Sequence, residues 1–230
     1  MTEPNKPTTP MATGGMSPEG TTTIVKTAQP KVSNSDRYVL CPAICKCKDT
    51  PGTSADGRSL KQACVSKALK SLDRTMDHKS WYKAEVNYDM TLHPPAPIMD
   101  SEVDTKGHDW LPGWIRKYWE DDHGSPYLKG VGMVRRPDVV IVKDPTKPPT
   151  QDNIEQVVEI KFPPDDWNKR QKEAYGIIAG GEDKLAKLEP DDCNCDRPDS
   201  GQASSIPAAD PKTVSAASML LMLLLGILAF

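Results

Sequence analysis

The sequence predicts an α/β (α+β) domain in which a small mixed sheet is flanked by helices, and three observations support this. Val139–Val142 is a short apolar run of β-branched residues, which is typical of a buried strand. A Pro-rich loop separates this run from a second apolar stretch, Gln156–Phe162, which also predicts a strand. Asp165 or Asp166 then offers an N-cap for a helix that runs to Ala179 and closes at two glycines. The order strand, loop, strand, helix is typical of α/β and α+β domains.

The composition indicates that much of the 230-residue chain is loop or tail. The hydrophobic fraction is 37%, below the roughly 45–50% of compact domains, and the 22 prolines are about twice the usual share. We therefore expect a packed core of about 130 residues. The net charge of −3 excludes a generally basic protein that coats nucleic acid. It does not exclude an enzyme that binds nucleic acid through one local basic patch.

Residues 1–36 are rich in Thr, Pro and Gly and show no apolar periodicity. Such a segment buries too little surface to offset its ordering entropy, so we expect it to be disordered. It has no apolar run after a basic start, so no secretory signal peptide is expected. Residues 37–192 form the predicted domain, 193–213 a linker, and 214–230 a hydrophobic tail.

The first half of the predicted domain contains further elements. Apolar residues recur at helical spacing over Ser59–Arg74, which predicts a helix, and Trp81–Met90 is interpreted as a strand that ends before two prolines. Downstream, Trp110, Trp114 and Tyr118 are four residues apart. This spacing predicts one helix face packed on the core, with a base-stacking platform as the alternative.

The C-terminal tail, Val214–Phe230, contains no charged residue. As a helix its 17 residues would measure about 26 Å, slightly less than the roughly 30 Å hydrocarbon core of a bilayer. A helix that is hydrophobic all round is either embedded in a membrane or wrapped by protein. We expect a transmembrane anchor that holds the protein at a membrane, with a chaperone-shielded or partner-bound segment as the alternative.

Six cysteines bracket the predicted domain, in the spacings C-x-x-x-C-x-C and C-x-C with one more between them. The two clusters would suit a Zn²⁺ site that joins the two ends of the domain, although neither has the common C-x-x-C spacing. Disulfides and unrelated free thiols remain equal alternatives. Cys64, on an apolar helix face, is expected to be a core residue. The candidate zinc ligands are Cys41, Cys45, Cys47, Cys193 and Cys195.

Two carboxylates and a lysine form the candidate active site: Asp138, Glu159 and Lys161. The tripeptide [DE]-x-K occurs five times in the chain, but only Glu159–Lys161 lies inside an apolar strand and follows a strand preceded by a carboxylate. Residues i and i+2 of a strand share a face, so Glu159 and Lys161 point the same way. Burying them is costly unless they are paired or functional. A plain cross-strand ion pair is the alternative.

Phosphodiester hydrolysis gives these three residues a use. Carboxylates at the ends of adjacent strands can bind Mg²⁺ or Mn²⁺ through oxygen ligands, with waters completing the shell. Asp138 and Glu159 would be ligands, and the backbone carbonyl of Ile160 a third. Lys161 would orient the attacking water or stabilise the charge that develops on the phosphate.

The segment M-V-R-R-P-D-V-V-I-V followed by E-I-K-F-P-P-D-D-W-N-K-R-Q-K-E-A-Y resembles the VRR-NUC branch of the PD-(D/E)xK nuclease superfamily. The resemblance covers Gly130–Leu188 and implies a restriction-endonuclease-like mixed sheet flanked by helices. It also implies that Gln171, on the helix after the second strand, faces the site, with Tyr175 one turn later. The family usually supplies a further acidic residue from upstream, for which Glu85 is the candidate.

We therefore expect a metal-dependent nuclease acting on nucleic acid, with DNA favoured. Arg135 and Arg136 would meet backbone phosphates, or lie on the surface as solvated side chains. The resemblance extends to bacterial toxins delivered by type VI secretion, which implies an antibacterial effector that has an immunity or chaperone partner and acts in a target-cell cytoplasm. The alternatives are an inactive nuclease fold that binds nucleic acid and a membrane-tethered interaction protein.

Overall fold

The computed structural model describes residues 31–55, 60–196 and 211–226. The helices are α1 (Asn34–Asp49), α2 (Lys61–Thr75), α3 (Leu111–Trp114), α4 (Glu120–His123), α5 (Lys169–Ala179) and α6 (Pro211–Leu224), with a π-helical turn at Ile115–Trp119 and a 3-10 turn at Glu182–Lys184. The strands are β1 (Tyr82–Ala84), β2 (Tyr88–Asp89), β3 (Ala96–Pro97), β4 (Val134–Arg135), β5 (Val139–Val142), β6 (Ile154–Ile160) and β7 (Leu185–Leu188). Most of the predicted disordered segment lies outside the described residues, and α1 begins just before its expected end.

The main sheet is mixed and has the order β1-β5-β6-β7. Strands β1, β5 and β6 pair antiparallel, and β6 pairs parallel with β7. The two strands expected from the apolar runs are therefore neighbours, with Val139 opposite Val158. A smaller antiparallel sheet has the order β3-β2-β4. The predicted α/β (α+β) class with a mixed sheet is confirmed.

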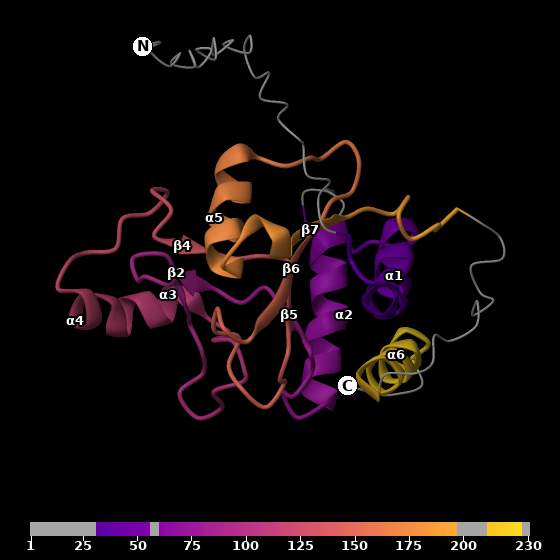
Figure 1. Ribbon diagram of the computed structural model, residues 1–230, viewed down its shortest axis with the longest axis horizontal. Helices are drawn as coiled ribbons and strands as arrows, with labels where there is room; N and C mark the ends of the chain where they lie inside the picture. Colours follow the sequence, from indigo (N-terminus) through magenta and orange to yellow (C-terminus); the bar gives the residue numbers. More distant parts are fainter. Residues whose placement is uncertain (1–30, 56–59, 197–210, 227–230) are drawn as a thin grey trace, which may run out of the picture.

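Helices cover both faces of the main sheet (Figure 1). One face presents Val139, Ile141 and Val158 to α1 and α2, where they share a buried core. The opposite face presents Val140 and Val157 to α5 and the smaller sheet. Because β5 is buried on both sides, its sequence is continuously apolar rather than alternating, whereas β6 is continuously buried only from Val157 to Ile160. This layering places the ends of β5 and β6 against α5.

Helices α2 and α5 form close to the expected positions. Helix α5 begins at Lys169, capped by the Asn168 side chain, which accepts a hydrogen bond from the Arg170 amide. The expected cap residues, Asp165 and Asp166, lie in the preceding loop instead. There the Asp166 carboxylate accepts hydrogen bonds from the Trp167 amide at 2.7 Å and from the Lys187 ammonium at 3.1 Å. The C-terminal end agrees with the prediction, because the first glycine after α5 adopts the left-handed conformation.

The expected continuous strand Trp81–Met90 is wrong. The segment forms two short strands in different sheets, β1 beside β5 and β2 beside β4. The chain breaks at Glu85, whose φ of 52° is incompatible with an extended strand. This break leaves Glu85 beside the start of β5, where its amide donates a hydrogen bond to the Asp138 carbonyl at 3.1 Å.

The expectation that Trp110, Trp114 and Tyr118 pack on the core is also wrong. Trp110 is 57% exposed, and Trp114 and Tyr118 are only half-buried. The helix changes to a π-helical turn after Trp114, and this wider turn rotates the following side chains relative to an α-helix. As a result Trp119 occupies the buried position, with 1% of its surface exposed.

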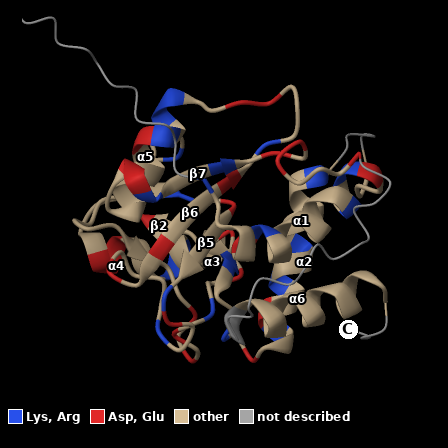
Figure 2. Cartoon of the chain, turned by 45° about the vertical axis from the view of Figure 1, so that its right-hand side comes forward, with Lys and Arg blue, Asp and Glu red and all other residues tan. Residues whose placement is uncertain are grey.

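The expected transmembrane segment at 214–230 is wrong, and much of it belongs to helix α6. Within the described residues, no helix is both long enough and apolar enough to cross a bilayer. Helix α6 instead folds back on α1 and α2, where Ala216, Leu220 and Leu223 join the core. Its ribbon lies beside these helices in Figure 2, and the Lys46 ammonium of α1 donates a hydrogen bond to the Leu224 carbonyl at its C-terminal end. Residues 227–230 of the tail lie outside the described residues.

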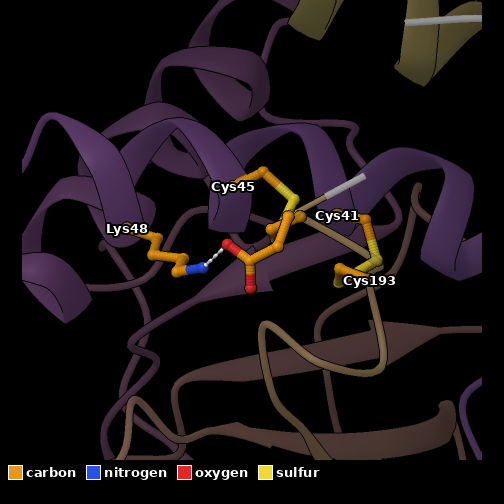
Figure 3. Close-up of a disulfide and its surroundings, with 6 residues drawn as sticks. Cys41, Cys45, Lys48 and Cys193 are labelled. Carbon is orange, nitrogen blue, oxygen red and sulfur yellow. Dashed lines mark hydrogen bonds and ion pairs between the residues drawn. A yellow bond between two sulfur atoms is a disulfide. The ribbon is translucent and has the colours of Figure 1, made fainter. Parts of the chain in front are cut away.

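The six cysteines form three disulfides, Cys41–Cys193, Cys45–Cys195 and Cys47–Cys64. Two of them join α1 to the segment after β7, and the Lys48–Asp196 ion pair lies beside them (Figure 3). Zinc binds sulfur as the thiolate, so the five candidate zinc ligands cannot hold zinc in this oxidised form. Cys64 is bonded to α1 rather than being the simple core residue expected. Of the three states considered for the cysteines, all six of which lie in the described residues, the structure therefore has the disulfides and neither a zinc site nor free thiols.

His123 ties α4 to the smaller sheet. Its Nδ1 lies 2.8 Å from the Trp119 carbonyl and its Nε2 lies 2.5 Å from the Asp89 carboxylate. Both partners are acceptors, so both ring nitrogens must donate, which requires the charged imidazolium. Desolvation lowers the pKa of His123, but the hydrogen bonds to Asp89 and to the Trp119 carbonyl outweigh it and the net pKa is raised.

We predict that His123 makes unfolding stability pH-dependent. A histidine whose pKa is raised in the folded state stabilises the fold fully below about pH 6.5, and the effect is lost as pH rises through the raised pKa. Thermal melts should therefore show a loss of stability as pH rises above about 6.5 in the wild type that is smaller in His123→Gln. The exposed His93→Gln variant is the control and should keep the wild-type slope.

Candidate active site

The β5–β6 register brings the two candidate carboxylates to the same end of adjacent strands. Asp138 immediately precedes β5, and Glu159 is one residue beyond Val158, the partner of Val139. Asp138 is fixed there because its Oδ2 accepts a hydrogen bond from the Ile160 amide at 2.9 Å. The structure therefore places both carboxylates where the sequence argument expected them.

Glu159 and Lys161 are buried on the α5 side of the sheet, with 1% and 7% of their surfaces exposed. The Lys161 ammonium lies 2.8 Å from Glu159 Oε1. The Gln171 amide nitrogen donates to the same oxygen at 2.6 Å, and its amide oxygen accepts from Lys161 at 3.2 Å. The three side chains thus form a closed set of hydrogen bonds that orients all of them.

The second carboxylate oxygen of Glu159, Oε2, is buried and has no hydrogen-bond partner in the described part of the chain. Leaving a buried charged oxygen unsatisfied is costly, and such atoms are rare in folded proteins. Both neighbouring donors, Lys161 and Gln171, contact the other oxygen. One position on Glu159 is therefore free for a cation or another donor.

The carboxyl pKa of Asp138 is shifted far from its ordinary value. Burial, followed by the negative charge of Glu159, raises the pKa of its carboxyl to about 7. The Ile160 hydrogen bond and the charge of Lys161 lower that pKa, but by less. Two carboxylates face one lysine here, so the ionised site has excess negative charge. A bound cation would relieve the repulsion between Asp138 and Glu159.

These groups fit the oxygen ligands that Mg²⁺ or Mn²⁺ requires. Asp138 and Glu159 would supply carboxylate oxygens, and the Ile160 carbonyl would be the third ligand from the chain. That carbonyl already accepts a hydrogen bond from Gln62 at 2.9 Å, which leaves one lone pair. Within the described ranges, no group of three or more His, Cys, Asp or Glu side chains is arranged to hold a metal. A site with two carboxylates and several waters is usual for Mg²⁺.

Tyr175 supports the site from α5, one turn after Gln171. Its hydroxyl donates to the Arg136 carbonyl at 2.7 Å and accepts from the Gln171 amide at 3.3 Å. Burial, followed by the charge of Glu159, raises the pKa of Tyr175, so the hydroxyl stays protonated and able to donate. Tyr175 therefore fixes Gln171 relative to the chain that leads into β5.

Glu85, the candidate upstream acid, lies next to the site but is paired with cations. Its carboxylate lies 2.8 Å from the Lys70 ammonium and 3.6 Å from the Arg136 guanidinium. Desolvation would raise the pKa of Glu85, but Lys70 outweighs it and the net pKa is lowered. Arg136 is exposed and Arg135 is half-buried, so both lie at the surface near Asp138.

Three contributors were not found by sequence reasoning. Gln62 of α2 contacts the Ile160 carbonyl, Lys70 of α2 pairs with Glu85, and the Trp167 ring lies 5.9 Å from the Lys161 ammonium. Gln62 and Lys70 come from the polar positions of an amphipathic helix, which carry no sequence signal of a site. Trp167 precedes α5 in the loop that the two adjacent prolines begin.

Comparison of the chain with protein-family models finds no match, and searches of curated proteins and of solved structures find none either.

We predict that Mg²⁺ stabilises the wild-type protein at pH 8 through Asp138. Saturating Mg²⁺ should raise the free energy of unfolding by about 1–3 kcal/mol, because it binds only the folded site. Asp138→Asn should lose this response. Without metal it should melt above the wild type at pH 8, because a carboxyl with a raised folded-state pKa destabilises the fold increasingly as pH rises from about 4 to about 7.

The matched control for this measurement is Asp104→Asn, in an exposed loop copy of the [DE]-x-K tripeptide. It should keep the wild-type melting temperature and the wild-type response to Mg²⁺. A wild-type protein whose melting is unchanged by both Mg²⁺ and Mn²⁺ would contradict the metal assignment.

Proposed function

We propose that the protein is a metal-dependent nuclease that hydrolyses phosphodiester bonds, with DNA as the favoured substrate. The observation that supports this best is the unpaired, buried Oε2 of Glu159 beside Asp138, with Lys161 and Gln171 bound to the other oxygen. We also propose that the mixed α+β fold is the restriction-endonuclease-like version found in the VRR-NUC branch of the PD-(D/E)xK superfamily, on the residues that carry that resemblance.

The chemistry divides between a bound cation and the residues of the chain. Mg²⁺ or Mn²⁺ held by Asp138 and Glu159 would supply Lewis acidity and lower the pKa of a coordinated water. Lys161 carries a positive charge fixed by two hydrogen bonds, so it can stabilise negative charge on a phosphate without reorganising. Gln171 holds Lys161 and Glu159 in one orientation, which is a positioning role.

Substrate would reach the site along the surface that carries Arg135 and Arg136. These side chains lie at the surface just before Asp138 in the chain, and arginine contacts to phosphate orient a nucleic acid without reading its sequence. Arg136 also lies near Glu85, so a phosphate would compete with that carboxylate for the guanidinium. The chain as a whole has a net charge of −3, so binding depends on this local basic surface.

A role as a secreted antibacterial effector with an immunity or chaperone partner is the biological setting we propose. The three disulfides support it, because disulfides persist in oxidising compartments and are rare in the reducing cytosol. In this setting the enzyme would act on nucleic acid in the cytoplasm of the cell that receives it.

Substitutions in the site should separate ligand, charge and positioning roles. Glu159→Gln should lower the cleavage rate roughly 100- to 1,000-fold, because it removes a ligand charge while keeping the shape. Lys161→Ala should do the same with little change in KM, since its charge matters most in the transition state. Gln171→Ala should cost about tenfold. Plasmid and oligonucleotide cleavage with Mg²⁺, with Mn²⁺ and with chelator is the measurement.

Asp104→Ala is the internal control and should cleave at the wild-type rate. If Glu159→Gln cleaves as well as the wild type while Asp104→Ala is inactive, the wrong tripeptide has been assigned. If no nucleic acid is cut under any metal condition but is still bound, the protein is an inactive nuclease fold that binds nucleic acid.

A further inference from the structure

An aromatic groove lies on the surface of α3 and the π-helical turn, away from the candidate active site. Its volume is about 600 Å³, and it is lined chiefly by Trp110, Trp114, Tyr118, Arg116 and Lys117. No Asp or Glu of the described residues lines this groove. The segment is anchored below by buried Trp119, so the three other rings are not needed to fill the core.

The rings in the aromatic groove are splayed rather than stacked on one another. The Trp114 and Tyr118 rings are 6.0 Å apart and inclined at 49°. The Arg116 guanidinium lies 5.4 Å from the Trp110 ring and the Lys117 ammonium lies 4.6 Å from the Tyr118 ring. Aromatic rings and positive charges therefore lie beside each other in one groove, which suits a strand with stacking bases and phosphates.

A second hollow, the basic cleft, adjoins the aromatic groove and reaches residues that lie near the active site. It has a volume of about 590 Å³, and Trp110 and His108 line both hollows. Five Lys and Arg side chains line the basic cleft against three Asp and Glu. Its lining also includes Glu85 and Arg136, the two neighbours of Asp138 described above.

We propose that the aromatic groove binds an unpaired nucleic-acid strand, with bases stacked on Trp110, Trp114 and Tyr118 and phosphates on Arg116 and Lys117. The basic cleft then leads the same strand toward Arg136 and the active site. The proposal rests on the proposed nuclease function and adds a substrate class to it. An unpaired strand is required because the faces of bases in a duplex are already stacked and cannot contact protein rings.

The test is fluorescence anisotropy of labelled DNA with the full-length protein in EDTA, which prevents cleavage. The probes are a single-stranded oligo-dT of about 20 nucleotides and a blunt duplex of the same length. The wild type should bind the single strand more tightly. Trp110→Ala and Trp114→Ala should each weaken single-strand binding roughly 5- to 100-fold, and Trp110→Phe should retain most of the affinity. Duplex binding should not change.

The salt dependence of binding tests the positive charges of the aromatic groove separately. The double variant Arg116→Ala, Lys117→Ala should reduce the slope of log K against log salt by about 0.7 for each phosphate that the protein no longer neutralises. Leu128→Ala and Lys147→Ala are exposed controls outside both hollows and should bind like the wild type. Thermal melts of each variant exclude unfolding as the cause of a weaker affinity.

Three outcomes would overturn the proposal. The first is that the wild type binds the duplex more tightly than the single strand, and the second is that folded Trp110→Ala binds the single strand as well as the wild type does. The third is that poly-glutamate displaces the labelled oligonucleotide at a lower concentration than unlabelled oligo-dT does, which would indicate a site for an acidic peptide. The nuclease proposal fails separately. If the protein binds the single strand through Trp110 but never cleaves, the groove assignment stands and the nuclease proposal fails. If the protein cleaves but Trp110→Ala binds the single strand as tightly as the wild type, the nuclease proposal stands and the groove assignment fails.

Discussion

The antiparallel pairing of β5 with β6 is the constraint on which the rest of the structure depends. With Val139 opposite Val158, Glu159 and Lys161 point toward α5, and Val158 and Ile160 point into the core beneath α1 and α2. A slip of one residue would exchange these faces and bury a glutamate and a lysine among aliphatic side chains. Because both faces of the sheet are covered, the register is specified by packing energy from two sides at once. The geometry of the polar site is thus a product of the apolar core.

Sequence reasoning succeeded where a pattern is local and its environment is implied by composition. The apolar runs at Val139–Val142 and Gln156–Phe162 are typical of buried strands, and their adjacency in sequence favours pairing. Glu159 and Lys161 in the second run are informative because charged side chains inside a buried strand need partners. What the sequence could not supply is which atoms Gln171 and Tyr175 bond to, or the break at Glu85. The left-handed conformation there accompanies contacts with Lys70 of α2 and with the Asp138 carbonyl before β5, both distant in sequence, and glutamate does not favour it.

The remaining errors come from elements whose environment is made by distant parts of the chain. A period of four residues fits an α-helix, and only the π-helical turn after Trp114 moves Trp119 inward in place of Tyr118. The uncharged tail has the composition of a membrane segment, but α1 and α2 offer a surface that accepts α6. The cysteine partners are separated by up to 152 residues, so spacing alone could not pair them. For the tail, hydropathy predicts burial correctly but does not identify the helices that bury it.

The Cys41–Cys193 and Cys45–Cys195 bonds close nearly the whole domain into a covalent ring. Every loop between α1 and the segment after β7 lies inside that ring, including the largely exposed run 124–131. A protease that cuts the run 124–131 would produce two pieces, one with α1 and α2 and one with Asp138 and Glu159. The bonds would still hold those pieces together, so no part could diffuse away until both disulfides were reduced. In oxidising surroundings, a single proteolytic cut would therefore leave the two pieces covalently joined. In the reducing interior of a cell the disulfides would be reduced and the pieces could separate.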